Sequence, residues 1–297
     1  MSFLFTKAAI KKKLNILKTL FLFRDIIKGE FYMKGDKMMD NIKETAKWLS
    51  NKTNNFKAEI IIITGSGLAN CLPELKNRIA IPYENIPNFP KTTVKGHTGE
   101  LIFGEFESKK LVIMRGRYHF YEGHDISFIS FPIRLLNFIG AKKLIVTAAV
   151  GSLKKEIKPG DILIIKDHIN LMGTNPLIGN YSPLFGEMFV DMVEPYNKNA
   201  ITRLLEISKK YNLDLHTGVY FAVSGPAYET ESEVKMYLML GGDVVGMSVV
   251  PEVISARQLK MDVCGITWIS NYTTGIGLDF FDHSKVLELG EKAGLKI

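Results

Sequence analysis

The sequence lacks the features that would place it outside the ordinary globular proteins. Of its 297 residues only two are cysteine, Cys71 and Cys264, and they stand far apart without the spacing of a metal-binding motif. A disulfide scaffold and a cysteine-built metal site are therefore excluded, and we expect a reduced, intracellular protein with buried, inert thiols. No internal repeat, low-complexity tract or linker divides the chain. With 46% apolar and 23% charged residues, this indicates one globular domain.

The sequence also lacks an apolar run long enough to cross a membrane. A spanning helix needs about 20 apolar residues, and basic residues interrupt and flank the best candidate, residues 14–23. Residues 1–38 form a basic, apolar leader with few serines and no clear signal cleavage site. We expect it to be a loose tail, or an artefact of a true start at Met33, Met38 or Met39, and we expect no membrane contact through it. A membrane-associated binding protein is the alternative that this leader leaves open.

The net charge of +7 is distributed very unevenly along the chain. The leader holds nine of the 38 basic residues and three of the 31 acidic ones, so 29 bases and 28 acids remain for residues 39–297. A near-neutral body is not typical of a protein built around a nucleic-acid surface, and we expect no nucleic-acid partner.

From residue 39 onward, short apolar runs alternate with longer mixed segments, which predicts an α/β domain with a central sheet. The expected strands are Glu59–Thr64, Leu101–Phe106, Lys110–Met114, Lys143–Thr147, Asp161–Lys166, Gly218–Val223, Asp243–Met247 and Val263–Ile269. The expected helices are Asn41–Leu49, Ser127–Ile139, Lys198–Lys210, Glu231–Leu240 and Pro251–Met261.

Two stretches after expected strands could bind an anion, since ligands of open α/β sheets collect at the carboxyl ends of the strands. Ser66 lies in a glycine turn that could offer N–H groups and a hydroxyl, or be only a tight turn into a helix. It completes neither a dinucleotide-binding nor a P-loop motif. Further on, an extended backbone would point Arg117, His119 and Tyr121 to one side. A solvated loop is the alternative for that stretch.

Two further stretches carry groups that could recognise a heterocycle. Glu229 lies between Tyr228 and Thr230, although a first-turn glutamate favoured by the helix dipole is the simpler interpretation. Ser270 and Asn271 end the last expected strand, where a side-chain amide could both donate to and accept from a base. A role in a turn is the alternative for this asparagine.

Together these stretches resemble the purine nucleoside phosphorylases of the trimeric type, within the nucleoside phosphorylase-I fold. No single motif is decisive, but their joint occurrence in the family's order is specific. The motifs are Gly65-Ser66-Gly67-Leu68, Ile86-Pro87-Asn88-Phe89-Pro90, Gly96-His97-Thr98-Gly99, Gly116-Arg117-Tyr118-His119-Phe120-Tyr121-Glu122-Gly123, Pro159-Gly160-Asp161-Ile162, Asp167-His168-Ile169-Asn170, Gly225-Pro226-Ala227-Tyr228-Glu229-Thr230, Gly246-Met247-Ser248-Val249-Val250-Pro251-Glu252, and Ser270-Asn271 with His283. The resemblance implies a single α/β domain over residues 39–297, with a central mixed sheet flanked by helices, and a cytoplasmic homotrimer.

Carried over to the matching positions, the resemblance also implies a set of site residues. Those that bind phosphate would be Ser66, His97, Arg117, His119, the backbone N–H of Ala149 and the hydroxyl of Ser248. Those that bind the nucleoside would be Tyr121, Tyr228, Glu229, Met247, Asn271 and His283. His119, Glu229 and Asn271 would be catalytic, and Glu122 would orient His119.

The implied reaction is the reversible phosphorolysis of 6-oxopurine (deoxy)nucleosides, such as inosine and guanosine, in purine salvage. The products would be the free base and (deoxy)ribose 1-phosphate, with inorganic phosphate as co-substrate and no metal or other cofactor. Cleavage of the N-glycosidic bond creates an oxocarbenium-like sugar and an electron-rich purine, so such an enzyme must stabilise both charges as they develop.

Two substitutions depart from the family pattern near the implied site. Ala148 stands where the family usually has asparagine, and Val150 where it has a smaller residue. The run over residues 149–153 is similar to the methylthioadenosine phosphorylases, so phosphorolysis of methylthioadenosine or adenosine is the alternative function. Asn271 and His283 favour 6-oxopurine nucleosides instead, because those enzymes carry aspartate at the first position and lack the second residue. Hydrolysis by water is a further alternative.

Overall fold

A computed structural model of the chain describes residues 36–68, 71–90, 99–180, 182–277, 290, 293 and 294. Almost all of the leader, and two predicted site residues, His97 and His283, lie outside the described residues. The expected domain boundary between residues 38 and 39 therefore stays a prediction. In the described part, no helix is both long and apolar enough to cross a membrane.

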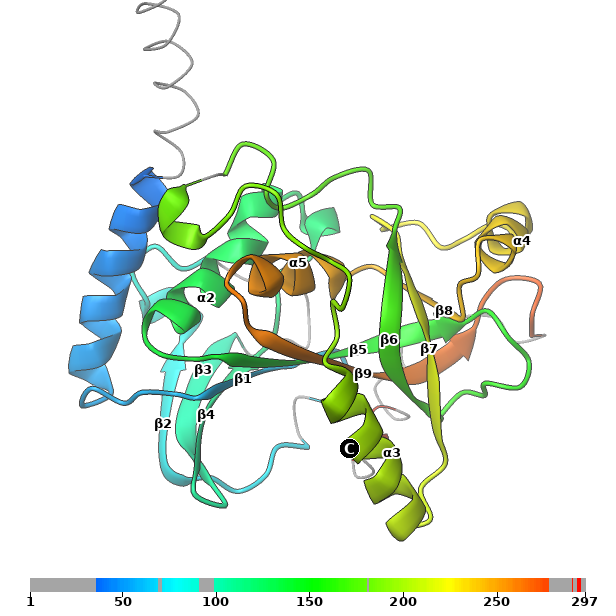
Figure 1. Ribbon diagram of the computed structural model, residues 1–297, viewed down its shortest axis with the longest axis horizontal. Helices are drawn as coiled ribbons and strands as arrows, with labels where there is room; N and C mark the ends of the chain where they lie inside the picture. The colour runs from blue at the N-terminus through cyan, green and yellow to red at the C-terminus, as the bar shows by residue number, and fades with distance from the viewer. Residues whose placement is uncertain are drawn as a thin grey trace, which may run out of the picture.

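The described strands form one mixed sheet, which confirms the predicted fold class (Figure 1). In chain order they are β1 (Ile60–Thr64), β2 (Lys76–Pro82), β3 (Glu100–Phe106), β4 (Lys109–Arg115), β5 (Lys143–Ser152), β6 (Ile162–Asn170), β7 (Leu215–Ala222), β8 (Val244–Gly246) and β9 (Asp262–Tyr272). Their order in the sheet is β2-β3-β4-β1-β5-β8-β7-β6-β9, and β9 pairs with β5 as well as with β6. Strands β5, β8, β7, β6 and β9 therefore close into a ring.

Helices cover both faces of this sheet (Figure 1). Those with described bounds are α2 (Ile126–Phe138), α3 (Lys198–Lys210), α4 (Glu231–Met239) and α5 (Val250–Gln258). Residues 36–52 form a further helix, and three 3-10 turns are η1 (Tyr83–Asn85), η2 (Phe120–Glu122) and η3 (Pro183–Phe185). Helices α2 and α5 pack together above the sheet in Figure 1, whereas α3 lies below it. This packing leaves the carboxyl ends of the central strands free to form a site.

The expected strands and helices are all present, and α3 has the expected bounds. Strand β2 was not predicted from the sequence. It is largely exposed and ends at Pro82, Asn77 within it has a positive φ of 53°, and its register with β3 is irregular. An edge strand of this kind lacks the apolar alternation that reveals a strand. Strands β5 and β9 are also longer than expected, since they continue through residues 148–152 and 270–272.

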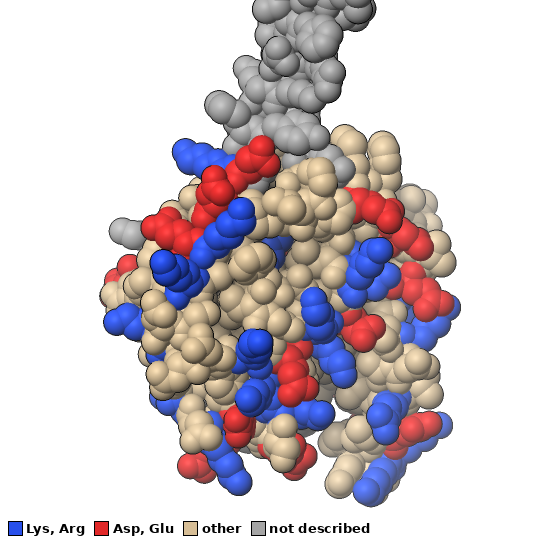
Figure 2. Space-filling model, turned by 60° about the vertical axis from the view of Figure 1, so that its left-hand side comes forward, with Lys and Arg blue, Asp and Glu red and all other residues tan. Residues whose placement is uncertain are grey.

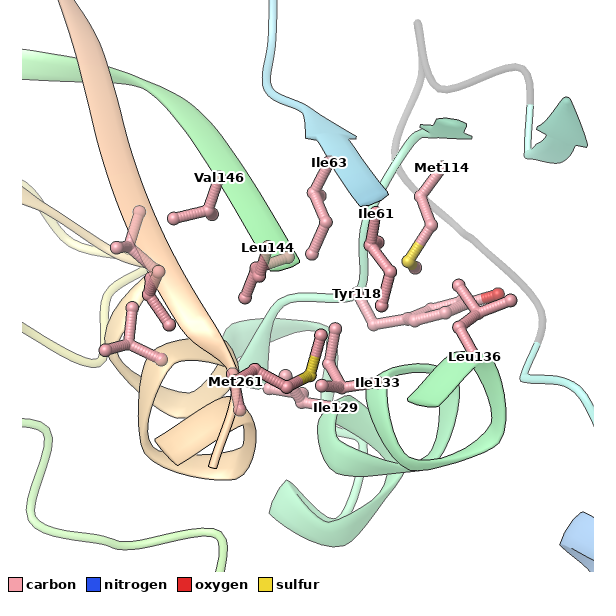
Figure 3. Packing of buried hydrophobic residues seen from close by; sticks show 14 of the residues in the cluster. Ile61, Ile63, Met114, Tyr118, Ile129, Ile133, Leu136, Leu144, Val146 and Met261 are labelled. Carbon is pink, nitrogen blue, oxygen red and sulfur yellow. The ribbon is translucent and has the colours of Figure 1, made fainter. Parts of the chain in front are cut away.

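The core between α2, α5 and the sheet explains why these elements form (Figure 3). Ile61 and Ile63 of β1 point to the same face because strand side chains alternate, and they meet the apolar face of α2. That helix begins with Asp125, whose carboxylate accepts a hydrogen bond from the N–H of Ser127 at 2.9 Å. Each fully buried side chain of this size contributes about 1.5–3 kcal/mol.

Leu136 of α2 is fully buried in this core, so its truncation should be costly. We expect Leu136→Ala to lower the free energy of unfolding by about 2–5 kcal/mol, because a cavity is left in packed surroundings. Urea unfolding followed by circular dichroism measures the change. Met239→Ala is the matched control, since Met239 is 81% exposed on α4, and a loss as large as that of Leu136→Ala would contradict this account of the core.

Charged side chains of both signs are interspersed over the face shown in Figure 2. This agrees with the near balance of 29 basic and 28 acidic residues after residue 38. The face in view therefore presents no continuous basic patch of the kind that attracts a phosphate backbone.

Candidate active site

A cavity of about 140 Å³ lies at the carboxyl ends of the central strands. This is the place expected for a ligand site in an α/β sheet, because β1, β4, β5 and β9 run parallel and their ends meet there. Ten of the twelve residues predicted to bind substrate line it: Ser66, Arg117, His119, Tyr121, Ala149, Tyr228, Glu229, Met247, Ser248 and Asn271. The other two, His97 and His283, lie outside the described residues.

A glycine turn after β1 places Ser66 in the cavity wall. A side chain at Gly65 would bring its Cβ within 2.8 Å of the Cα of Ala148, so only glycine permits this approach of the turn to β5. The N–H of Gly65 donates to the hydroxyl of Thr147 at 2.9 Å, which fixes the approach. The turn does not lead into the helix considered from the sequence, because residues 71–75 are not helical.

Arg117 is held in the cavity wall by two side chains, Ser248 just before α5 and Glu252 in the first turn of that helix. It is only 2% exposed, and its Nη1 donates to the hydroxyl of Ser248 at 3.0 Å. Its Nε lies 3.1 Å from Oε1 of Glu252, which is also buried. The N–H of Ser248 in turn donates to the hydroxyl of Tyr220 at 3.2 Å. These contacts give the guanidinium a defined orientation before any ligand arrives.

The turn between Ser248 and α5 is conformationally strained. Val249 has φ +67° and ψ −59°, a combination that β-branched residues rarely adopt. Its side chain is completely buried, so surrounding packing holds the backbone in this state. Strain of this kind concentrates at functional sites, where it positions neighbouring groups such as Ser248.

His119 is oriented by Glu122, as the sequence analysis predicted. Its Nδ1 lies 2.9 Å from Oε1 of Glu122, and its backbone N–H donates to the same oxygen at 2.8 Å. The alternation expected in this stretch holds for Arg117 and His119, which line the cavity while Tyr118 between them is buried in the core. Tyr121 also lines the cavity, as expected, although it lies in η2 and not in extended backbone; its ring stacks on His119 with centroids 4.7 Å apart.

Glu229 lies just before α4 and not in its first turn. Its interpretation as a first-turn glutamate favoured by the helix dipole is therefore wrong. Thr230 is the N-cap of α4 and forms a capping box with Glu233. Glu229 itself lines the cavity, where burial raises the pKa of its carboxyl; a backbone hydrogen bond partly offsets this, and the charge of Glu233 adds to it. The exposed ring of Tyr228 lies beside it in the cavity wall.

Asn271 belongs to β9 rather than to a turn, which corrects the alternative considered for it. Its Oδ1 accepts from the hydroxyl of Ser270 at 2.6 Å, and its Nδ2 donates to the carbonyl of Tyr272 at 2.9 Å. These two bonds define which atom of the amide is the donor. The other hydrogen of Nδ2 is then free to meet an acceptor on a ligand.

The two residues that depart from the family pattern, Ala148 and Val150, lie in β5. The side chains of Ala148 and Val150 are almost completely buried, and both residues contribute to the lining of the cavity. The prediction that Ala149 offers its N–H stays open, although Ala149 lines the same cavity.

Two residues that support the site, Glu252 and Tyr220, were not predicted from the sequence. Glu252 was noticed only as part of a motif, and Tyr220 was not singled out. An acidic residue in the first turn of a helix that begins at Val250–Pro251 has an ordinary explanation in the helix dipole, so its contact with Arg117 could not be foreseen. Tyr220 lies in the middle of an apolar strand and carries no local signal.

Comparison with known proteins defines the class to which this fold and cavity belong. Residues 59–297 match the family model of the phosphorylase superfamily. The chain is 44% identical to purine nucleoside phosphorylase 1 of Geobacillus stearothermophilus over 251 residues, which cover 84% of this chain and 91% of the relative. The chain belongs to the purine nucleoside phosphorylases of this superfamily, which are glycosyltransferases that act on pentosides.

Solved structures agree with this assignment. The structure of Schistosoma mansoni purine nucleoside phosphorylase in complex with adenosine is similar with a TM-score of 0.80 and 37% identity, covering 86% of this chain and 92% of that one. A Schistosoma purine nucleoside phosphorylase in complex with guanosine has a TM-score of 0.78, with the same identity and coverage. Nucleosides with different substituents at purine C6 thus bind to relatives of this fold.

Proposed function

We propose that this protein cleaves 6-oxopurine nucleosides with phosphate as the nucleophile and the residues described above as its catalytic machinery. The observation that carries this proposal is the meeting of two sets of groups in one cavity. Arg117, His119 and Ser248 form a set suited to an anion, while Glu229 and Asn271 form a set suited to a purine. A hydrolase would need no anion-binding arginine of this kind.

The anion-binding set suits inorganic phosphate. The planar guanidinium of Arg117 can donate two parallel hydrogen bonds to phosphate oxygens. The hydroxyls of Ser66 and Ser248, the N–H of Ala149 and the ring of His119 add donors around the same anion, and His97 would complete the set at its edge. Phosphate held in this way serves both as nucleophile and as the negative charge that stabilises an oxocarbenium-like sugar.

The purine-binding set suits a base with an oxygen at C6. The remaining hydrogen of Nδ2 of Asn271 would be shared between O6 and N7, and this bond would strengthen as the base leaves with its electron pair. The carboxylate of Glu229 would accept from the N1–H of the same base. Tyr121 and Met247 would hold the ribose, with His283 at its 5′-hydroxyl and Tyr228 packed against sugar and base.

The reaction needs no metal or redox cofactor in this scheme. Phosphate supplies the nucleophile directly, and Asn271 and Glu229 assist the leaving group without a Lewis acid. We therefore propose that inorganic phosphate is a co-substrate and that the protein carries no resident cofactor.

We further propose a cytoplasmic homotrimer. The segment between β6 and α3 exposes large apolar side chains, as expected of a surface covered by another subunit. They are Leu171, Ile178, Leu184, Met188, Phe189 and Val193. The two cysteines, Cys71 and Cys264, are unbridged, which suits a reducing compartment. Light scattering coupled to size-exclusion chromatography tests the assembly, and a monomeric mass would contradict it.

Purine release tests the function directly. Inosine, guanosine and methylthioadenosine are each incubated with and without phosphate, and the products are separated by chromatography. We expect hypoxanthine and guanine, together with ribose 1-phosphate, only when phosphate is present. Methylthioadenosine as the best substrate would overturn the assignment of the base-binding residues, and turnover without phosphate would indicate hydrolysis.

The raised pKa of Glu229 leads to a prediction about pH. Only the carboxylate form accepts the N1–H, so kcat/KM for inosine should fall as the pH drops through this pKa. Because burial raises the pKa, the midpoint of this acid limb should lie above 4.5, the ordinary value for glutamate. Initial rates at saturating phosphate across the acid range give the midpoint. The limb should vanish in Glu229→Gln, and its persistence there would assign it to another group.

A further inference from the structure

We propose that the carboxylate of Glu252 acts as a built-in counter-ion of Arg117 and weakens phosphate binding at that guanidinium. This inference rests on the proposed function, since it takes phosphate as the anion that Arg117 binds. In this scheme Glu252 is a positioning residue, because it acts through Arg117 and does not touch the substrate.

The geometry joins the two side chains in a buried ion pair. Oε1 of Glu252 lies 3.1 Å from Nε of Arg117, and the two side chains are 4% and 2% exposed. Glu252 stands in the first turn of α5, four residues after Ser248, whose hydroxyl accepts from Nη1 of the same arginine. The carboxylate thus contacts the Nε side of the guanidinium, whose Nη1 is bonded to Ser248 at the cavity wall.

The second carboxylate oxygen strengthens the inference. Oε2 of Glu252 is buried and has no hydrogen-bond partner among the described residues. The negative charge is therefore compensated mainly by Arg117 and by the positive end of α5, not by a larger network. In a buried site, charges a few ångströms apart interact far more strongly than in water.

When phosphate binds to Arg117, the guanidinium interacts with two anions at once, the phosphate and the carboxylate of Glu252. The attraction between phosphate and Arg117 is then opposed by repulsion from Glu252, and the net affinity is lower than an unpaired arginine would give. Between turnovers, the carboxylate spares the protein a buried cation without a counter-charge. The same balance would help ribose 1-phosphate to leave, because that product carries the phosphate group with it.

The substitution Glu252→Gln removes the negative charge of the side chain but keeps its size and shape. Glutamine keeps an oxygen at the position of Oε1, which lies 3.1 Å from Nε of Arg117, and its amide nitrogen replaces Oε2, which has no hydrogen-bond partner among the described residues. We expect the dissociation constant for inorganic phosphate, measured by isothermal titration calorimetry, to fall about tenfold in this variant. The KM for inosine should stay within about twofold of the wild type, because the base-binding residues are untouched. Ribose 1-phosphate should inhibit the variant more strongly than the wild type.

Thermal unfolding gives a second readout on the same protein. Without phosphate, Glu252→Gln should melt at a lower temperature than the wild type, because Arg117 loses its counter-charge. Added phosphate should raise the melting temperature of the variant more than that of the wild type, since at a given phosphate concentration the stabilisation increases as the dissociation constant falls. Glu252→Asp keeps the charge but withdraws it by one methylene, and it should change phosphate affinity in the same direction by about threefold. If Glu252→Gln does not fold, the phosphate affinity of Glu252→Asp tests the inference in its place.

Ser255→Ala is the matched control on the same helix. Ser255 lies one turn further along the buried face of α5, with its hydroxyl 2.8 Å from that of Ser130, and it does not line the cavity. This variant should loosen α5 without changing phosphate affinity. An equal gain in affinity in Ser255→Ala would overturn the inference, because the effect would then come from the helix and not from the charge.

The outcomes distinguish the inference from the proposed function. If the wild type does not bind phosphate, or cleaves inosine equally well without it, the proposed function fails. If phosphate binds and Arg117→Ala weakens it, but folded Glu252→Gln binds phosphate no more tightly than the wild type, only the role of Glu252 is wrong.

Discussion

Replacing Asn271 by alanine should lower kcat for inosine by about two orders of magnitude, the effect of losing one hydrogen bond made in the transition state. The bond from this carboxamide to the base strengthens as the purine accumulates charge, so its loss raises the barrier more than it weakens binding. The side chain is already oriented by Ser270 and Tyr272, so little reorganisation accompanies the reaction. Steady-state kinetics at saturating phosphate measure the change.

Asn271→Asp is the matched control for this prediction. It keeps the size and the oxygen of the side chain but removes the amide donor to O6. We expect a loss with inosine similar to that of the alanine variant, together with a gain of activity with adenosine, whose 6-amino group donates. A change confined to KM in Asn271→Ala, or an unaltered preference in Asn271→Asp, would contradict the role assigned to this residue.

Arg117→Ala should have the second large effect, a rise of about 100-fold in the KM for phosphate, since two charge-assisted hydrogen bonds are lost. The same change leaves the buried carboxylate of Glu252 without its partner, so the free energy of unfolding should fall by about 3–5 kcal/mol. Phosphate titrations of the initial rate and urea unfolding measure the two effects separately. The KM for inosine should change much less than that for phosphate.

Arg115→Ala is the matched control for Arg117→Ala, because it also removes one arginine. Arg115 lies two residues earlier, at the end of β4, and its Nη1 donates to Glu100 at 2.8 Å in a partly exposed ion pair. It does not line the cavity, so its removal should leave the KM for phosphate within about twofold, and its ion pair contributes little to stability. An unchanged KM for phosphate in Arg117→Ala would remove Arg117 from the anion site.

The local pattern of the chain was sufficient to predict most of the secondary structure. Helix α3 matches its expected bounds because Asn197 caps its start and lysines occupy its last turn, both of which are short-range signals. Strand β2 was not predicted because it is an exposed edge strand, and its pairing with β3 depends on distant residues. The continuation of β5 and β9 past their apolar runs also depends on pairing, since each supplies the other's hydrogen bonds there.

The sequence was sufficient to predict which residues belong to the site, but not how they are arranged in space. The motifs indicated which residues belong to it, and ten of them line one cavity although they span the chain from Ser66 to Asn271. Spacing along the chain could not show that Tyr121 enters the cavity from a 3-10 turn, or that Glu229 precedes its helix instead of starting it. Both depend on how neighbouring elements terminate against the sheet.

Composition, periodicity and short-range chemistry are enough to specify the α/β class, the approximate positions of its elements and the family to which its motifs point. The closure of five strands into a ring, and the burial of the pair of Arg117 and Glu252 beside Ser248, depend instead on the folded chain as a whole. The pairing of β5 with β9 that closes the ring, and the pair of Arg117 and Glu252, join residues more than 100 positions apart. Contacts at that separation arise from packing and desolvation that no local pattern records.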